Sequence, residues 1–446
     1  MRIIIAGAGE MGFHLAKLLA AEEQDIVIVD TDSEVLEYVS SYLDVSTVKG
    51  SSTSPSTLKK ANVTKADLLI AVTSIQDTNL TTCIIGKSLG AKKTVARISN
   101  IEYLKQKDEL NLKGLGIDEV ISPASLAAKE IKRLLKQTAL TDTFDFEKGT
   151  LSLLGLTIDE GSELMNKTLT ETAYLNPGLN FTTVAILRDE KTIIPHGGNK
   201  FQKDDHAYFI AQPEGVEAVT NLVGKESFEI KNVMILGGSN VGINTASLLS
   251  KKYNIKLIEK SKEKCIELAE ELQDTMVING DGRDVNLLKE ESISRMDAFI
   301  ALTENSETNI MSSLLAKNYG VKKTIALVEN DDYIHLSQSI GVDTLINKKL
   351  IAANFIFRYV RKGDVVDLTS IHGVDAEILE FEVGDNAKIL KRELRDLDFP
   401  KTAIIGGVVR DGRGMTVRGN FEFNPKDKVV VLSKPECIRK VESFFK

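Results

Sequence analysis

The sequence lacks the features that mark several large classes of protein. Its 446 residues include no tryptophan, eight prolines and three cysteines. Cys83, Cys265 and Cys437 lie far apart and form no C-x-x-C pair, so we expect neither a disulfide framework nor a metal site. They are most simply explained as thiols of a protein in a reducing cytoplasm.

Charge and hydropathy exclude two further classes. The net charge of −8, without a local cluster of lysine and arginine, argues against a nucleic-acid surface, which needs a basic patch. The chain has no run of about eighteen apolar residues, the length that a membrane-spanning helix requires. The opening apolar run meets glycines before it reaches the length of a signal peptide. We therefore expect a cytoplasmic protein that reaches a membrane only through a partner.

The opening stretch has the pattern of a nucleotide-binding unit. The apolar run Arg2–Ala6 is typical of a strand buried on both faces of a parallel sheet. Gly7, Gly9 and Gly12 follow with G-x-G-x-x-G spacing and open a predicted helix at Met11–Ala21. The first glycine permits a tight turn, the second lets a pyrophosphate approach the backbone, and the third lets the helix pack closely on the strand. The helix N-terminus presents free N–H groups to that phosphate.

A second apolar run, Ile26–Val29, ends in Asp30, which stands 18 residues after Gly12. A carboxylate at this place accepts hydrogen bonds from the adenosine ribose. It also disfavours the 2′-phosphate of NADP, so the pattern predicts an NAD site. The alternative is a βαβ unit in which the glycines only permit a tight turn and no ligand is bound.

Strands and helices alternate from Arg2 to Pro123, which predicts an α/β unit with a doubly wound parallel sheet. A longer helix is predicted after Pro123, where the chain leaves the sheet. Between about 143 and 211 the sequence changes to short β-rich runs with one predicted helix near Glu163–Glu171. This texture indicates a small α+β module.

The whole pattern then repeats, so the chain is a tandem duplication. Gly237 and Gly280 copy Gly7 and Gly50 at a constant offset of 230 residues. We expect four domains: a Rossmann-like, NAD-binding unit at 1–123, a second Rossmann-like unit at 230–350, and small C-terminal lobes at 140–225 and 364–446.

Polar residues follow the strands of the first unit at the rim where ligands bind in open parallel sheets. Ser51 and Ser52 are placed to contact the adenine and ribose, and Thr73 and Ser74 the pyrophosphate or second ribose. Arg97 is placed to bind a phosphate. The alternative for each serine or threonine is helix capping.

The second unit departs from the first. Its loop has Gly237 and Gly242, but Ser239 stands where the middle glycine should be, which should weaken binding or change its geometry. Glu259 replaces the aspartate, and Asp281 stands at the position of Ser51. We expect two sites that differ in ligand or affinity, with a purely structural second unit as the alternative.

Nothing in the sequence assembles a catalytic site, so we expect a protein that is not an enzyme. Hydride transfer needs a positioned acid or base, yet His196, His206 and His372 do not recur at matching positions of the repeat. Two predicted nucleotide sites without catalytic residues beside them indicate a sensor. An NAD-dependent oxidoreductase stays open as the alternative.

The glycine loop with Asp30, the repeated AVTSIQDTN and ALTENSETN segments and the large-plus-small layout resemble the regulators of potassium conductance (RCK), in the tandem form of Trk system potassium uptake proteins. The resemblance implies a homo-oligomeric ring that gates a membrane potassium-translocating subunit, TrkH/TrkG-like, in response to NAD(H), ATP or ADP. A ring that regulates another ion transporter stays open. The nucleotide positions that it implies are Gly7, Ala8, Gly9, Glu10, Met11, Gly12, Asp30, Ser51, Ser52, Thr73, Ser74 and Arg97, and in the second unit Gly237, Ser239, Gly242, Glu259 and Asp281.

Two helices are candidates for packing between lobes or subunits. One follows Pro123, and the other lies around Lys349–Val360. The aromatic run FIFRY in the second helix fits an interface, and ordinary core is its alternative.

Overall fold

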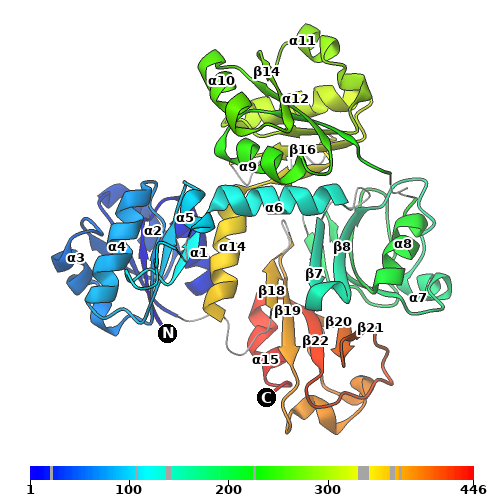
Figure 1. Ribbon diagram of the computed structural model, residues 1–446. Coiled ribbons are helices and arrows are strands. Elements are labelled where there is room, and N and C mark those ends of the chain that lie inside the picture. The colour runs from blue at the N-terminus through cyan, green and yellow to red at the C-terminus, as the bar shows by residue number, and fades with distance from the viewer. Residues whose placement is uncertain are drawn as a thin grey trace.

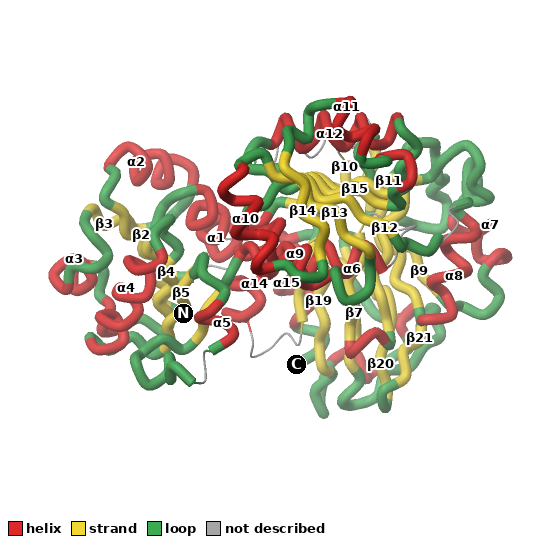
Figure 2. Tube along the Cα trace, turned by 45° about the horizontal axis from the view of Figure 1, so that its top comes forward, coloured by secondary structure: helices red, strands yellow, loops and turns green. Residues whose placement is uncertain are grey.

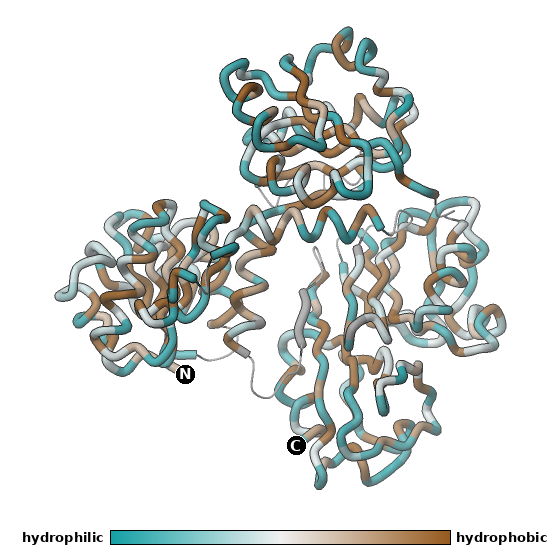
Figure 3. The backbone as a smooth tube through the Cα atoms, in the orientation of Figure 1, coloured by the Kyte–Doolittle hydropathy of each residue, from teal (hydrophilic) through white to brown (hydrophobic). Residues whose placement is uncertain are grey.

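The fold is described from a computed structural model of residues 1–20, 24–106, 109–136, 142–189, 191–224, 228–329, 341–361, 367–370 and 374–446. These residues form four β-sheets, two of them large and parallel and two small and antiparallel (Figure 1). In Figure 3 the hydrophobic colour is concentrated inside each lobe, and the outer helices carry both hydrophobic and hydrophilic residues. The α/β fold class predicted from the sequence is confirmed.

The first sheet has the order β3-β2-β1-β4-β5-β6, and all its strands are parallel. The order reverses between β1 and β4, which is the switch point of a doubly wound sheet. Its strands are β1 (Arg2–Ala6), β2 (Asp25–Asp30), β3 (Ser46–Lys49), β4 (Leu68–Ala71), β5 (Lys93–Arg97) and β6 (Glu119–Ile121). Its helices are α1 (Glu10–Ala20), α2 (Ser33–Tyr42), α3 (Pro55–Lys60), α4 (Gln76–Ser88) and α5 (Glu102–Lys105).

The second large sheet repeats this topology in the order β14-β13-β12-β15-β16-β17. Its strands are β12 (Asn232–Leu236), β13 (Asn254–Glu259), β14 (Thr275–Asn279), β15 (Ala298–Ala301), β16 (Lys323–Leu327) and β17 (Thr344–Ile346). Its helices are α9 (Asn240–Leu249), α10 (Lys262–Glu271), α11 (Val285–Glu290) and α12 (Ser306–Asn318).

The two small sheets are antiparallel and pack on each other through a shared apolar cluster. The first contains β7 (Asp142–Phe146), β8 (Leu151–Thr157), β9 (Phe181–Arg188), β10 (Lys191–Ile193) and β11 (His206–Ala211), with α7 (Leu169–Thr172) and α8 (Pro213–Leu222). The second contains β18 (Asp367–Ser370), β19 (Glu377–Glu382), β20 (Ala403–Arg410), β21 (Arg413–Met415) and β22 (Lys428–Ser433), with α15 (Ile438–Glu442).

The helix predicted near Glu163–Glu171 is wrong over most of its length. Only the short α7, with Thr168 and Glu171 in a capping box, is helical there. Before it, backbone N–H groups bond to other segments: Glu163 donates to the carbonyl of Leu222, and Asn166 to that of Phe201. These contacts take the donors that a helix would use for its own turns.

A buried ion pair recurs in the two small sheets at the end of a hairpin. In the first, Arg188 forms a bidentate pair with Asp205, whose side chain is fully buried, with both N–O distances at 2.7 Å. Arg410 and Asp427 repeat it with distances of 2.8 and 2.7 Å. Because a paired and buried carboxylate fixes both partners, the pair holds the hairpin against the next strand.

The two units exchange their exit helices. Helix α6 (Pro123–Lys136) leaves the first unit and packs on α9 of the second, and α14 (Lys348–Arg361) leaves the second unit and packs on α1 of the first. The two exit helices also contact each other, as Figures 1 and 2 show. Leu15 of α1 and Ile356 of α14 lie fully buried in one apolar cluster. The prediction that these helices pack between lobes is therefore confirmed.

Candidate functional site

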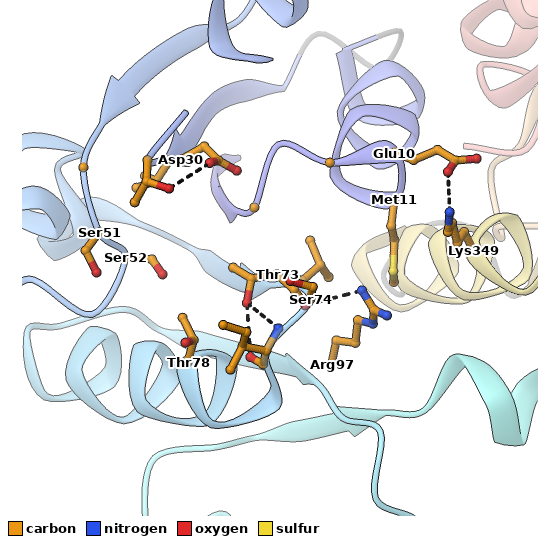
Figure 4. A pocket seen from close by; sticks show the side chains of 17 residues that line it. Glu10, Met11, Asp30, Ser51, Ser52, Thr73, Ser74, Thr78, Arg97 and Lys349 are labelled. Atoms are coloured by element: carbon orange, nitrogen blue, oxygen red, sulfur yellow. Dashed lines mark hydrogen bonds and ion pairs between the residues drawn. The ribbon is translucent and has the colours of Figure 1, made fainter. Parts of the chain in front are cut away.

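The first parallel sheet carries a cavity of about 550 Å³ at the carboxyl ends of its strands, a size typical of small-molecule sites. Most of the residues predicted to bind a nucleotide surround it (Figure 4). Those that line it are Gly7, Gly9, Glu10, Met11, Asp30, Ser51, Ser52, Thr73, Ser74 and Arg97. Gly50, which precedes the two serines, also lines it, and sequence reasoning missed Val29, Thr31, Val72, Ile75, Thr78 and Lys349.

The glycine loop has three glycines with different environments. Gly7 has φ +108°, and a Cβ there would lie 2.9 Å from the backbone nitrogen of Thr73. A Cβ on Gly12 would lie 1.9 Å from the carbonyl oxygen of Gly7, so this glycine permits the turn and does not line the cavity. A Cβ on Gly9 would meet nothing within 4 Å. Gly9 therefore borders open space, where a ligand can approach the backbone.

Asp30 connects the end of β2 to the glycine loop. Its Oδ2 accepts a hydrogen bond from the N–H of Ala8 at 2.7 Å, and its Oδ1 accepts one from Asp32 at 3.1 Å. Ala8 is buried and does not line the cavity. A carboxylate oxygen can accept more than one hydrogen bond, so Asp30 keeps capacity for ligand hydroxyls while it orders the loop.

A buried asparagine joins the ends of β4 and β5. The side chain of Asn79 accepts hydrogen bonds from the N–H and hydroxyl of Thr73 at 2.9 and 2.7 Å. It donates to the carbonyls of Thr73 and Arg97, both at 3.0 Å. Asn309 makes the same set of bonds in the second unit. The recurrence of this asparagine 230 residues later is the sequence signal that could have identified it.

Arg97, Ser51 and Ser52 differ in their burial and in the hydrogen bonds that they form within the protein. Burial lowers the pKa of Arg97, and the nearby Glu329 opposes that shift. Ser51 bonds within its own turn, with its hydroxyl 2.8 Å from that of Thr53. Ser52 is buried and accepts a hydrogen bond from Thr82 at 2.9 Å. Neither serine caps α3, because its N-cap residue is Ser54.

The second parallel sheet carries a cavity of about 580 Å³ at the same place. Gly237, Ser239, Glu259 and Asp281 line it, and Gly242 does not. Sequence reasoning missed its other lining residues: Leu236, Ile258, Lys260, Lys264, Gly280, Gly282, Arg283, Thr303, Glu304, Asn305 and Thr308.

Three polar side chains that line the second cavity form hydrogen bonds within the protein. The Ser239 hydroxyl donates to the carbonyl of Leu302 at 2.6 Å and caps α9. Glu259 accepts a hydrogen bond from Gly238 at 2.8 Å, as Asp30 does from Ala8. Asp281 pairs with Arg283 at 2.7 Å, and these hydrogen bonds hold its pKa well below the usual value. The two cavities are thus similar in place and different in chemistry.

Histidine and cysteine line neither cavity among the described residues. His196 and His206 lie in the first small lobe, and His372 lies outside the described residues. Within the described ranges, no cluster of histidine, cysteine and carboxylate side chains is arranged to hold a metal ion. In that same part of the chain, no helix is both long and apolar enough to cross a membrane.

The fold resembles solved structures of GsuK. The structure described as the GsuK RCK domain matches with a TM-score of 0.60 and 16% identity, over 99% of this chain and 94% of that one. The structure described as the GsuK channel bound to NAD matches with a TM-score of 0.59 and 16% identity, over 100% of this chain and 78% of that one. At this identity the likeness concerns the fold.

Sequence comparison is more specific. The TrkA-N domain model matches residues 3–123 and 233–348, and the TrkA-C domain model matches residues 153–224 and 378–446. The Trk system potassium uptake protein TrkA homolog 1 of Methanosarcina mazei is 33% identical over the full length of both chains. The Trk system potassium uptake protein TrkA of Haemophilus influenzae is 34% identical over all of this chain and 98% of its own. The chain therefore belongs to the TrkA family of Trk system potassium uptake proteins.

Proposed function

We propose that this protein is a nucleotide-sensing subunit that gates a potassium uptake transporter. The observation that carries the proposal is a pair of unequal cavities on two Rossmann-like sheets whose glycine-loop helices pack on exchanged exit helices. Solved structures of GsuK, which shares this fold, are described as bound to NAD and to ADP. In this proposal residues 1–123 and 230–350 are the nucleotide lobes, and 140–225 and 364–446 are the small lobes.

The first cavity is proposed to bind NAD(H), with ATP and ADP as competing ligands. Asp30 would bind the adenosine ribose, and its charge favours NAD over NADP. Gly9 and the N-terminus of α1 would face the pyrophosphate, with Arg97 as a cationic contact. The second cavity, where Ser239 and Asp281 are engaged by the protein, would bind more weakly or bind a different nucleotide.

The protein is proposed to act in the cytoplasm, as part of a homo-oligomeric ring that contacts a TrkH/TrkG-like membrane subunit. A ligand shifts such a ring only by the difference between its affinities for two ring conformations. A tenfold difference corresponds to about 1.4 kcal/mol for each site, so several sites that respond together give a large effect.

Calorimetric titration tests the binding part of this proposal. NAD, NADH, ATP and ADP are titrated into the full chain and into Asp30→Ala and Glu259→Ala variants. We expect Asp30→Ala to weaken NADH binding at least tenfold and Glu259→Ala to leave the tighter site intact. Equal NADH affinity of Asp30→Ala and the parent would show that the first site is misassigned.

Potassium flux into vesicles that contain the membrane subunit tests the gating part. We expect NADH or ATP to change the flux only when this protein is present. Flux without any dependence on nucleotides would contradict the proposal. Formation of NADH from NAD and an added substrate would favour an oxidoreductase instead.

A further inference from the structure

The first cavity contains one residue from the other half of the chain. Lys349 is the second residue of α14, which leaves the second unit, and it lines the cavity of the first unit. Figure 4 shows its side chain directed toward Glu10, at the start of α1. The Nζ of Lys349 lies 2.5 Å from Oε2 of Glu10, a contact between residues 339 positions apart.

The backbone around Lys349 is well fixed. Its N–H donates to Oδ1 of Asn347 at 2.9 Å, and the Asn347 side chain donates to the carbonyl of Glu329 at 3.1 Å. Leu350 is buried, and α14 packs along α1. The packing of α14 on α1 and the contact with Glu10 therefore hold the ammonium group at the wall of the cavity.

Lys349 is charged and already neutralised by carboxylates. Its Nζ also lies 3.3 Å from Oε2 of Glu329, whose other oxygen is 3.2 Å from Lys348. Burial opposes the charge on Lys349, and its contacts with Glu10 and Glu329 outweigh burial and raise its pKa. The lysine is thus a cation at neutral pH that an incoming anion can engage by exchange of partners.

The charged groups that line the cavity are balanced without a ligand. Glu10 and Asp30 are negative, and Arg97 and Lys349 are positive. A nucleotide pyrophosphate adds negative charge near the start of α1, where it would repel Glu10 and attract the two cations. The ion pair between Glu10 and Lys349 is the contact that such a ligand would disturb first.

The second cavity has no such residue. By alignment of β6 with β17, Ala124 on α6 corresponds to Lys349, and Asn240 corresponds to Glu10. Ala124 is buried in the apolar interface with the second unit. The cations that line the second cavity, Lys260, Lys264 and Arg283, all belong to the second unit. In the described part of the chain, only the first cavity is completed by the opposite unit.

We propose that Lys349 is a phosphate ligand of the first site, supplied by the second unit, and that bound nucleotide exchanges its ion pair with Glu10 for a contact with phosphate. This inference rests on the nucleotide site proposed above. It makes occupancy of the first site depend on the position of α14, and therefore on the arrangement of the two units. The same linkage makes bound nucleotide favour the arrangement that holds Lys349 in the cavity.

The test is calorimetric titration of NADH, ADP and adenosine into the full chain and into Lys349→Gln. We expect NADH and ADP to bind at least tenfold more weakly to the variant, and adenosine, which has no phosphate, to bind within twofold of the parent. Lys349→Arg should restore most of the affinity because it keeps the charge. Lys348→Gln is the matched control, since Lys348 pairs with Glu329 and does not line the cavity.

A double-mutant cycle separates the proposed exchange of partners by Lys349 from simple repulsion between Glu10 and the phosphate. Glu10→Gln should tighten NADH binding severalfold in the parent and clearly less in the Lys349→Gln background. Unchanged NADH affinity in Lys349→Gln, with Asp30→Ala still defective, overturns this inference and leaves the proposed function intact. Failure of the parent chain to bind any of the nucleotides overturns both. Circular dichroism and the elution volume of each variant check that it is folded and assembled as the parent is.

Discussion

Replacement of Gly9 by alanine should separate folding from nucleotide binding. The added methyl group meets nothing within 4 Å in the protein, so the free energy of unfolding should change by less than about 0.5 kcal/mol. Serine occupies the matching position in the second unit, where the same turn forms. The fold therefore tolerates a side chain at this place.

In the proposed site, the same methyl group would occupy the space through which a pyrophosphate would approach the loop. If bound nucleotide must shift to avoid it, overpacking costs about 1–3 kcal/mol, which corresponds to roughly a tenfold to hundredfold loss of NADH affinity.

Gly12→Ala is the opposite case, in which we expect an effect on folding. Its Cβ would lie 1.9 Å from the carbonyl oxygen of Gly7, so the helix or the turn must move, and we expect about 3 kcal/mol of destabilisation.

Calorimetry with NADH and urea unfolding followed by circular dichroism measure the two effects on the same samples. Circular dichroism is chosen because the chain has no tryptophan. A folded Gly9→Ala variant with the NADH affinity of the parent would refute the proposed role of the loop. A Gly12→Ala variant as stable as the parent would refute the steric argument.

Three further predictions concern the supports of the sites and the cysteines. Asn79→Ala should cost about 2–3 kcal/mol in unfolding by urea, because it removes the partner of the Thr73 N–H, and it should also weaken NADH binding; an equally stable variant would contradict this. Arg410→Met should lower the free energy of unfolding by about 2 kcal/mol, which is less than for a fully buried pair because the Arg410 side chain is 27% exposed. A loss below about 0.5 kcal/mol, the usual effect of a surface substitution, would contradict this prediction. Cys83 is fully buried and its pKa is raised by burial, so at pH 8 mass spectrometry should find it alkylated after the partly exposed Cys437; the reverse order would contradict the packing.

Local sequence patterns predicted the large sheets well. A strand such as Arg2–Ala6 is a continuous apolar run followed by a glycine, and this signal depends only on neighbouring residues. The repeat then fixed the alignment of the second sheet on the first. Most predicted rim residues surround a cavity, because parallel strands end at one edge of their sheet.

Contacts between segments that are distant in the sequence could not be predicted from local sequence patterns. No local pattern places Lys349 beside Glu10, because their contact depends on how α14 packs on α1. The same reason explains the wrong helix near Glu163, where carbonyls of Leu222 and Phe201 take the backbone donors. The glycine-loop pattern likewise could not predict the hydrogen bond that the Ser239 hydroxyl donates to the carbonyl of Leu302.

The exchange of exit helices within one chain has a consequence for symmetry. In a dimer of two identical single units, every residue at such an interface occurs twice, so a lysine that enters one site must enter both. Here the two exit helices differ in sequence, and one carries Lys349 where the other carries Ala124. Covalent fusion thus allows the two halves of the interface to differ in sequence, so that a lysine of the opposite unit lines the first cavity while the residues that line the second cavity all belong to its own unit.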